Sequence, residues 1–237
     1  MSVYAVADLH GQLELWEQIS KFLKEDDTIY VLGDCGDRGL QPWETIKAVY
    51  RDPRAIYIKG NHEDILVKAM REWHDYETWH SDAIDLLYYN GGAETFDGWH
   101  HDGSKMEWAN RLNTLPIYAK YINKDGVEIH MTHSGSVELC EQDCLWDRTH
   151  FNEDWLGEEH QLIIHGHTNV AHVWKALGFP QDNKPSMGKA YWYCDGNKVC
   201  LDVGSYISNI AIILNLDTFE EYKFEIERKE ENEDEEI

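Results

Sequence analysis

Five short apolar segments of the chain each end in polar side chains of the kinds that bind metal ions. The segments have the length and β-branched character of buried strands, and they cover residues 3–7, 28–32, 55–58, 127–132 and 161–164. The polar residues that follow them are Asp8 and His10, Asp34, Asn61 and His62, His133, and His165 and His167. Asp and Asn often cap helices at such positions, but histidine has no comparable preference. Because the loops at the carboxyl ends of strands form the usual site of an α/β sheet, we expect these side chains to lie together.

Helical patterns separate the first three of these strands. Apolar residues recur at helical spacing between 13 and 23, Pro42 suits the first turn of a second helix, and a third helix is expected to run through Met70. The order of strand, loop and helix predicts βαβ units and an α/β fold. Further along, we expect a long polar loop after residue 168, a hairpin from 190–194 and 198–203, and a strand pair from 210–216 and 220–227.

The segment 71–115 has a different composition, because it is rich in tryptophan, tyrosine and histidine. We expect two helices, around 80–89 and 104–113, joined by a turn at Gly91-Gly92. The segment is expected to cover the edge of the sheet as a helical cap. Its aromatic side chains are interpreted as core residues rather than as a surface for stacking ligands, and its histidines as solvated or hydrogen-bonded.

The length of 237 residues predicts a single domain over residues 1–227. The tail at 228–237 holds six acidic residues and is expected to be disordered. The formal charge of −24 argues against broad binding of nucleic acid, which needs a basic surface. The chain shows no signal-peptide pattern and no apolar run that could span a membrane, and its five cysteines suit free thiols in a reducing compartment. We therefore expect a cytoplasmic protein that binds neither nucleic acid nor membranes.

The candidate ligands are carboxylates, imidazoles and one amide, without a thiolate. This set suits Mn²⁺, Fe or Zn better than Cu(I) or an iron–sulfur cluster. There are enough donors for two ions, and a carboxylate such as Asp34 can bridge both. Two ions about 3.5–4 Å apart can hold a phosphoryl group and lower the pKa of a shared water.

The motifs around these residues resemble those of the calcineurin-like metallophosphoesterases. They are D-x-H-G from residue 8, G-D-x-x-D-R-G from 33, G-N-H-E from 60, H-S-G from 133 and H-G-H-T from 165. The resemblance is greatest to the phosphoprotein phosphatase branch, particularly its small bacterial and phage serine/threonine phosphatases. Weaker similarity at 89–92, 115–116 and 201–204 extends it over most of the chain. It implies the metallo-dependent phosphatase fold, in which central mixed β-sheets form a sandwich flanked by helices.

The resemblance also implies a role for each site residue. The first metal would be held by Asp8 and His10, both metals by the bridging Asp34, and the second by Asn61, His133 and His167. His62 and Asp37 would form the acid pair that protonates the leaving oxygen, and Arg38 and Arg148 would bind the phosphate oxygens. Attack on phosphorus would be in line, by a hydroxide held between two ions, for which Mn²⁺ is expected and Fe or Zn are the alternatives. His165 is expected to support these ligands, with direct metal binding as the alternative.

The favoured function is hydrolysis of phosphoserine and phosphothreonine in proteins. The substrate could also be a phosphorylated small molecule, and the main alternative is a symmetrical diadenosine tetraphosphate hydrolase, which shares these motifs. A protein that binds metal without catalysis would lack His62, Asp37 or Arg38, and all three are present. The acidic charge disfavours a nuclease, as does Asn169, because nuclease-like branches place a further histidine beyond the last motif.

Overall fold

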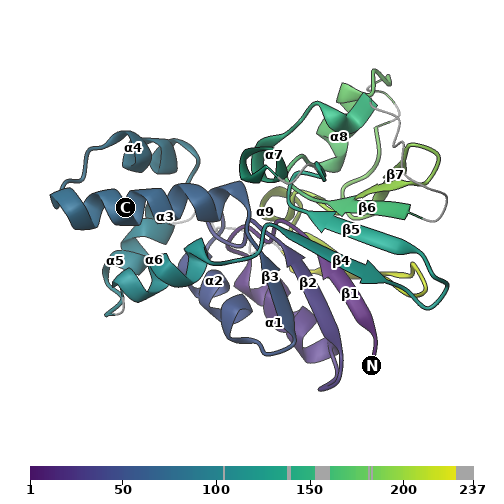
Figure 1. Cartoon of the computed structure of the whole chain (residues 1–237), viewed down its shortest axis with the longest axis horizontal. Coiled ribbons are helices and arrows are strands. Elements are labelled where there is room, and N and C mark those ends of the chain that lie inside the picture. Colours follow the sequence, from purple (N-terminus) through teal and green to yellow (C-terminus); the bar gives the residue numbers. More distant parts are fainter. Residues whose placement is uncertain (104, 138–139, 153–160, 181, 183, 228–237) are drawn as a thin grey trace, which may run out of the picture.

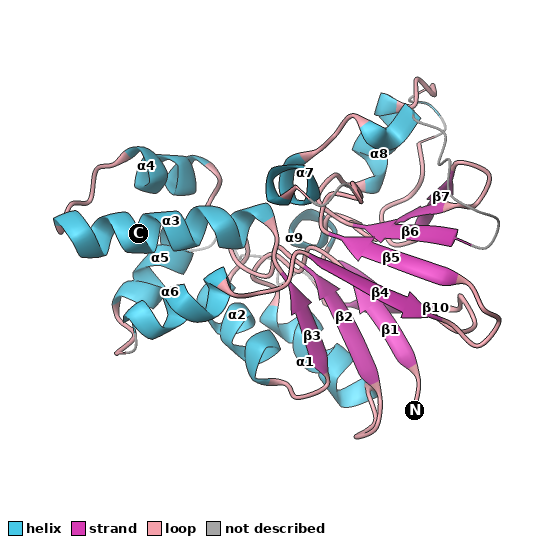
Figure 2. Cartoon of the chain, viewed as in Figure 1, coloured by secondary structure: helices cyan, strands magenta, loops and turns pink. Residues whose placement is uncertain are grey.

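Two five-stranded mixed sheets pack face to face in the computed structural model of the chain, which describes residues 1–103, 105–137, 140–152, 161–180, 182 and 184–227 (Figures 1 and 2). The first sheet has the order β10-β9-β1-β2-β3 and the second the order β4-β5-β6-β8-β7. The strands of the first sheet are β1 (Val3–Val6), β2 (Thr28–Leu32), β3 (Ala55–Ile58), β9 (Ile210–Asn215) and β10 (Glu221–Glu225). Those of the second are β4 (Tyr118–Ile122), β5 (Glu128–Thr132), β6 (Gln161–His165), β7 (Tyr191–Tyr193) and β8 (Lys198–Cys200).

Alternation along β1 places its side chains in two separate layers of the core. Val3 and Ala5 point between the sheets, where Ile129 and Ile164 of the second sheet meet them. Tyr4 and the other alternate residue of β1 belong to the cluster on the outer face, which the helices cover. These helices are α1 (Leu13–Phe22), α2 (Pro42–Arg51) and α3 (Asn61–Tyr76). The 3₁₀ helix η1 (His150–Asn152) and α8 (Val170–Ala176) pack against residues of β7 and β8 in the second sheet. The helix α7 (Glu141–Trp146) follows β5 along the chain.

Parallel pairing directs the carboxyl ends of the central strands to one place. β1, β2 and β3 run parallel, as do β5, β6 and β8. Figure 1 shows the tips of β1–β3 and of β5 and β6 turned toward the middle of the molecule, where the two sheets meet the short helix α9 (Ser205–Ser208). The mixed sandwich flanked by helices confirms the fold that the sequence predicts.

The cap contains one more helix than expected. Between α4 (Asp82–Tyr89) and α6 (Lys105–Asn113) lies α5 (Ala93–His100), where only a Gly91-Gly92 turn was predicted. Gly98 weakens the helical pattern of α5 in the sequence. In the structure it lets α5 approach α2, because a Cβ at this position would lie 2.7 Å from Cβ of Trp43.

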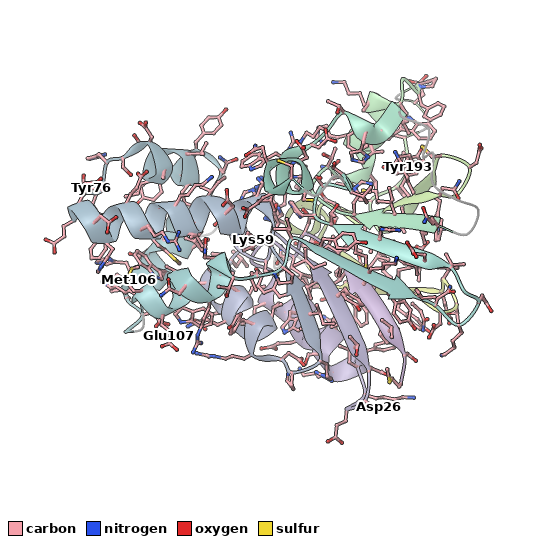
Figure 3. All side chains as sticks on the ribbon, in the orientation of Figure 1. Asp26, Lys59, Tyr76, Met106, Glu107 and Tyr193 are labelled. Atoms are coloured by element: carbon pink, nitrogen blue, oxygen red, sulfur yellow. The ribbon has the colours of Figure 1, made fainter. Side chains whose placement is uncertain are left out.

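The aromatic side chains of the cap divide into two groups. Phe96, Trp99 and Trp108 are buried, as predicted for core residues. Tyr76, Trp79, Tyr88 and Tyr89 are exposed, which corrects the prediction for these four. Figure 3 shows Tyr76 at the far end of α3, away from the sheets.

Other segments also depart from the expectation. The edge strand β4 was not predicted, and α8 begins where a long loop was expected, with Asn169 as its cap through a hydrogen bond from the backbone N–H of His172. No helix in the part of the chain that the structure describes is long and apolar enough to cross a bilayer. The expected disordered tail at 228–237 lies outside the described residues, and the single-domain boundary remains a prediction.

Candidate active site

The loops after β1, β2, β3, β5 and β6 bring the predicted metal ligands into one buried cluster. These ligands are Asp8, His10, Asp34, Asn61, His133 and His167. Asp34 is at the centre of the cluster, since its Oδ2 lies 3.3 Å from Nε2 of His133 and 3.7 Å from Nε2 of His10. It therefore has the position that a carboxylate shared by two ions requires.

Donor atoms converge in two groups that share Asp34. The groups are His10, Asp34 and His62, and Asp34, His133 and His167, and within each the donor atoms lie within 4.8 Å of one another. Asn61 belongs with the second group, because its Oδ1 lies 2.9 Å from Nε2 of His133 and 3.0 Å from Nδ1 of His167. The chain thus offers two adjacent places for a cation.

Asp8 differs from its predicted place in the first group. Its Oδ1 lies 3.9 Å from Nε2 of His10, and both its oxygens accept the backbone N–H of His167, at 3.1 and 3.0 Å. His62, rather than Asp8, completes the first group of converging atoms. Gly166 permits the close approach of Asp8, because a Cβ there would lie 1.9 Å from its Oδ2. Asp8 remains a predicted ligand that borders this group.

The charges in the cluster suit the binding of cations. Burial raises the pKa of Asp8, and the negative charge of Asp202 raises it further. Burial acts to lower the pKa of His133, but the carboxylate of Asp34 outweighs it and the pKa rises to about 10. The carboxylates therefore attract positive charge at the place where an ion is expected.

Two other histidines provide neutral donors. Burial lowers the pKa of His10 and of His167 well below the usual imidazole value, so each ring is uncharged at neutral pH and offers a lone pair. Neither donor group contains a cysteine. A set of oxygen and imidazole donors suits Mn²⁺, Fe or Zn, so the residues present fit two divalent cations.

The predicted acid pair is in contact. Nδ1 of His62 lies 2.5 Å from Oδ2 of Asp37, and both side chains are buried. Burial acts to lower the pKa of His62, but the charge of Asp34 and the hydrogen bond to Asp37 together raise it. Asp37 therefore stabilises a charged His62 and fixes the orientation of its ring.

The two predicted phosphate-binding arginines border the same space. Nη1 and Nη2 of Arg38 lie 2.9 Å from Nε2 of His10 and 2.8 Å from Nε2 of His62, and the ring of Tyr206 lies 5.1 Å from the guanidinium carbon. Nε of Arg148 donates to Nε2 of His167 at 3.0 Å. A cavity of about 240 Å³ is lined by Asp34, Arg38, Asn61, His62, Arg148 and His167 among others.

His165 points away from this cavity. Its Nε2 lies 2.8 Å from the hydroxyl of Tyr193 and its Nδ1 lies 2.9 Å from the carbonyl of Gly166. Both ring nitrogens are thus engaged within the protein. The arrangement agrees with a supporting role behind the loop that carries His167.

Glu63, Thr95 and Asp202 were not predicted, although they hold the site together. Glu63 accepts hydrogen bonds from the backbone N–H groups of Asp34, Cys35 and Gly60. It is the last residue of the G-N-H-E motif, so the motif could have indicated its role. Asp202 is buried, and burial raises its pKa to about 6. Thr95 contacts Asp37 from the cap, and nothing near it in the sequence marks that contact.

Backbone strain is concentrated in this cluster. Eleven non-glycine residues among those described have a positive φ, and six of them are at the site: Asp8, His10, Asp34, Asp37, Arg38 and His167. Such conformations cost about 1–3 kcal/mol each and persist where the surroundings hold them. Their concentration supports a functional role for these loops.

A sandwich fold with buried carboxylates and imidazoles at the strand ends, beside two arginines, defines a metal-dependent phosphoesterase. The chain belongs to the calcineurin-like phosphoesterase family, whose family model matches residues 1–217. Members of this family use two metal ions, and the two donor groups of this chain could hold them.

Relatives among curated proteins match only part of the chain. One is a symmetrical bis(5′-nucleosyl)-tetraphosphatase of Pseudomonas syringae, 26% identical over 148 residues, which are 60% of this chain and 50% of that protein. Another is a Streptomyces avermitilis protein provisionally named agmatine deiminase, 27% identical over 104 residues, which are 44% of this chain and 30% of that protein. The chain therefore spans half or less of the length of these relatives.

Solved structures share the fold over nearly the whole chain. A crystal structure provisionally described as a diadenosine tetraphosphatase has a TM-score of 0.60 at 13% identity, covering 94% of this chain and 92% of the other. A Saccharomyces cerevisiae serine/threonine phosphatase with similarity to human PP5 also scores 0.60, at 14% identity, covering 97% and 82%. At these identities the likeness concerns the fold alone.

Proposed function

We propose that the chain hydrolyses phosphomonoesters, with phosphoserine and phosphothreonine in proteins as its substrates. One observation carries the proposal. His62, which is paired with Asp37, and both arginines border the small cavity that residues of the two donor groups also line. A phosphate there would meet groups that bind its oxygens and a group that can protonate the leaving oxygen.

Asp8, His10 and Asp34 would hold one divalent cation, and Asp34, Asn61, His133 and His167 the other. Mn²⁺ is our choice, with Fe and Zn as alternatives. Bound there, such ions supply Lewis-acid polarisation of the phosphoryl group and a water of lowered pKa. The remaining steps belong to side chains of this chain.

Arg38 and Arg148 bind the phosphate from two sides of the cavity. Guanidinium groups match phosphate oxygens geometrically and stabilise the charge that develops in transfer. The contact between Arg38 and the Tyr206 ring limits the directions that the guanidinium can take. Arg38 now donates to Nε2 of His62, so the arrival of phosphate would draw the guanidinium away and free that nitrogen.

His62 then acts as the general acid. Its Nδ1–H is held by Asp37. Once Arg38 no longer donates to Nε2, this nitrogen can take up a proton from water, which the raised pKa of His62 favours, and pass it to the leaving oxygen. Alkoxides leave poorly without such a proton. The pair is therefore needed most for serine and threonine esters.

The substrate class is supported by a second cavity, of about 460 Å³, which shares Arg38, Asn90, Arg148 and His167 with the first. Tyr89, at 89% exposure, stands on its rim. The residues that line this second cavity are mostly polar, which suits a polypeptide that lies across the site.

The second candidate is a symmetrical dinucleoside tetraphosphate hydrolase, which the name of the Pseudomonas syringae relative favours. The test is Mn²⁺-dependent product release from a pool of phosphoserine and phosphothreonine peptides, beside diadenosine tetraphosphate at equal concentration. We expect faster hydrolysis of the peptides, and a His62→Asn variant that retains its metals but loses most of that rate. Faster cleavage of the dinucleotide would establish the second candidate, and bound metal without turnover of either would indicate a binding protein.

A further inference from the structure

The cap meets the catalytic loop at the junction of α4 and α5. The backbone N–H of Arg38 donates to the carbonyl of Gly91 at 2.9 Å. The backbone N–H of Asp37 donates to Oγ1 of Thr95 at 3.0 Å, and the Thr95 hydroxyl donates in turn to Oδ1 of Asp37. Gly92 fits closely beneath them, since a Cβ there would lie 2.9 Å from Oδ1 of Asp37.

These contacts hold two residues in a strained conformation. Asp37 and Arg38 are consecutive non-glycine residues with φ of 63° and 66°. A left-handed backbone is unfavourable for residues other than glycine, so the pair needs partners to fix it. Thr95 is fully buried and supplies both a donor and an acceptor to Asp37.

The two oxygens of Asp37 have separate partners. Oδ1 accepts the hydroxyl of Thr95, whereas Oδ2 faces Nδ1 of His62 at 2.5 Å. The bond to Thr95 therefore sets the rotation of the carboxylate, and through it the plane of the His62 ring. The threonine methyl group also packs here, because a Cβ on Gly36 would lie 3.4 Å from it.

We propose that Thr95 is a positioning residue for the general acid, supplied by the cap. The cap then serves catalysis by orienting Asp37 and His62, in addition to any contact with substrate. The inference rests on the proposed role of His62 as the acid. It does not depend on whether the substrate is a protein or a nucleotide.

The test compares two aryl phosphates that differ in how much they need a proton. p-Nitrophenolate leaves readily without protonation, whereas phenolate depends more on the acid. We expect Thr95→Val to lower kcat on phenyl phosphate about 10–100-fold, a share of what general acids contribute, with a change below about 3-fold on p-nitrophenyl phosphate. Thr95→Ser keeps the hydroxyl and should restore most of the rate on phenyl phosphate.

Two controls make the result specific. Thr45 is also fully buried, and its hydroxyl donates to the carbonyl of Gln41 at 2.8 Å rather than to the acid pair. Thr45→Val should therefore change both substrates alike. Metal content and thermal unfolding of each variant are measured, and Thr95→Ala is made in parallel so that misfolding of the valine variant does not decide the outcome.

The His62→Asn variant distinguishes the acid role of His62 from the positioning role of Thr95. If it shows the selective loss on phenyl phosphate and the folded Thr95 variants do not, the role of Thr95 is overturned while that of His62 stands. If His62→Asn lowers both rates equally, the acid role fails and the inference on Thr95 fails with it. Equal losses in Thr95→Ser and Thr95→Val would also overturn it, because the hydroxyl would then be irrelevant.

Discussion

Replacement of Glu63 tests how the metal-binding loops are held. Its buried carboxylate accepts four hydrogen bonds. Three come from the backbone N–H groups of Asp34, Cys35 and Gly60, at 2.8, 2.9 and 2.8 Å, and one from the hydroxyl of Tyr57 at 2.6 Å. The residue thus ties the loop after β2 to the start of α3, and each of these segments carries predicted ligands.

The magnitude follows from the partners of each oxygen. In Glu63→Gln the amide group is best placed at Oε1, because the Tyr57 hydroxyl can rotate to accept from it. The N–H of Cys35 then faces another donor, and an unsatisfied buried group costs about 1–3 kcal/mol. Burial raises the pKa of Glu63 and the charge of Asp34 raises it further, so loss of the negative charge offsets part of that cost. We expect Glu63→Gln to lower the free energy of unfolding by about 2 kcal/mol.

Glu63→Ala leaves all four donors without their partner and opens a cavity. We expect a loss of about 4 kcal/mol or more, which is in the range of severe core substitutions. Urea unfolding at pH 7 with a chelator present measures both variants without a contribution from metal. The control is Glu220→Gln. Glu220 also accepts a hydrogen bond from a tyrosine hydroxyl, at 2.6 Å, but it is exposed. We expect this substitution to change the free energy of unfolding by no more than about 0.5 kcal/mol. A Glu63→Gln variant as stable as the parent, or an alanine variant no worse than the glutamine one, would refute the reasoning.

Three further predictions concern other parts of the molecule. Asp34→Asn should lower metal affinity at least about 100-fold and abolish phosphatase activity, because Asp34 belongs to both donor groups. Atomic absorption after dialysis measures the bound metal, and unchanged turnover would contradict the prediction. Asp202 has its pKa raised to about 6 by burial, so the folded chain binds a proton that the unfolded chain loses near pH 4. The chelated protein should therefore lose stability as pH rises from about 4 to above 6, by up to about 3 kcal/mol, and Asp202→Asn should flatten that dependence in urea titrations at several pH values. Asp52 accepts hydrogen bonds from Arg54 and Ser20, and those from Arg54 lower its pKa. Asp52 therefore contributes to the free energy of unfolding above about pH 4, and this contribution is lost as pH falls through the lowered pKa of the folded state. Asp52→Asn should lower the free energy of unfolding by about 1 kcal/mol at pH 7 and by less at pH 3, and it should leave activity unchanged.

The sequence predicts the strands of the site well because each is a short apolar run that ends in a motif. β2 and β3 coincide with the expected residues, and the loops after them carry their donors to one edge of the sandwich. Elements without such a pattern were missed. β4 is an edge strand with half-exposed residues and a lysine at its centre, so no clear alternation marks it.

The contacts that complete the site could not be predicted from local pattern. Thr95 and Asp37 are 58 residues apart, and α5, which carries Thr95, was itself missed. The partners of Asp8 are likewise distant, since His167 donates to it from 159 residues away. Local sequence shows which side chains can bind a metal, but the geometry among them is decided by how the two sheets pack.

The glycines of the motifs explain how those distant loops come close enough. A Cβ on Gly11 would lie 2.9 Å from Cα of Gly39, and a Cβ on Gly33 would lie 2.6 Å from Cα of Gly60. The loops after β1, β2 and β3 therefore touch backbone to backbone, which any larger residue at these points would prevent. This contact fixes loops whose acidic, histidine and arginine residues have left-handed backbone conformations. The motif thus encodes two separate requirements: charged and imidazole side chains for the chemistry, and glycines that let the loops pack tightly enough to hold those side chains in strained positions.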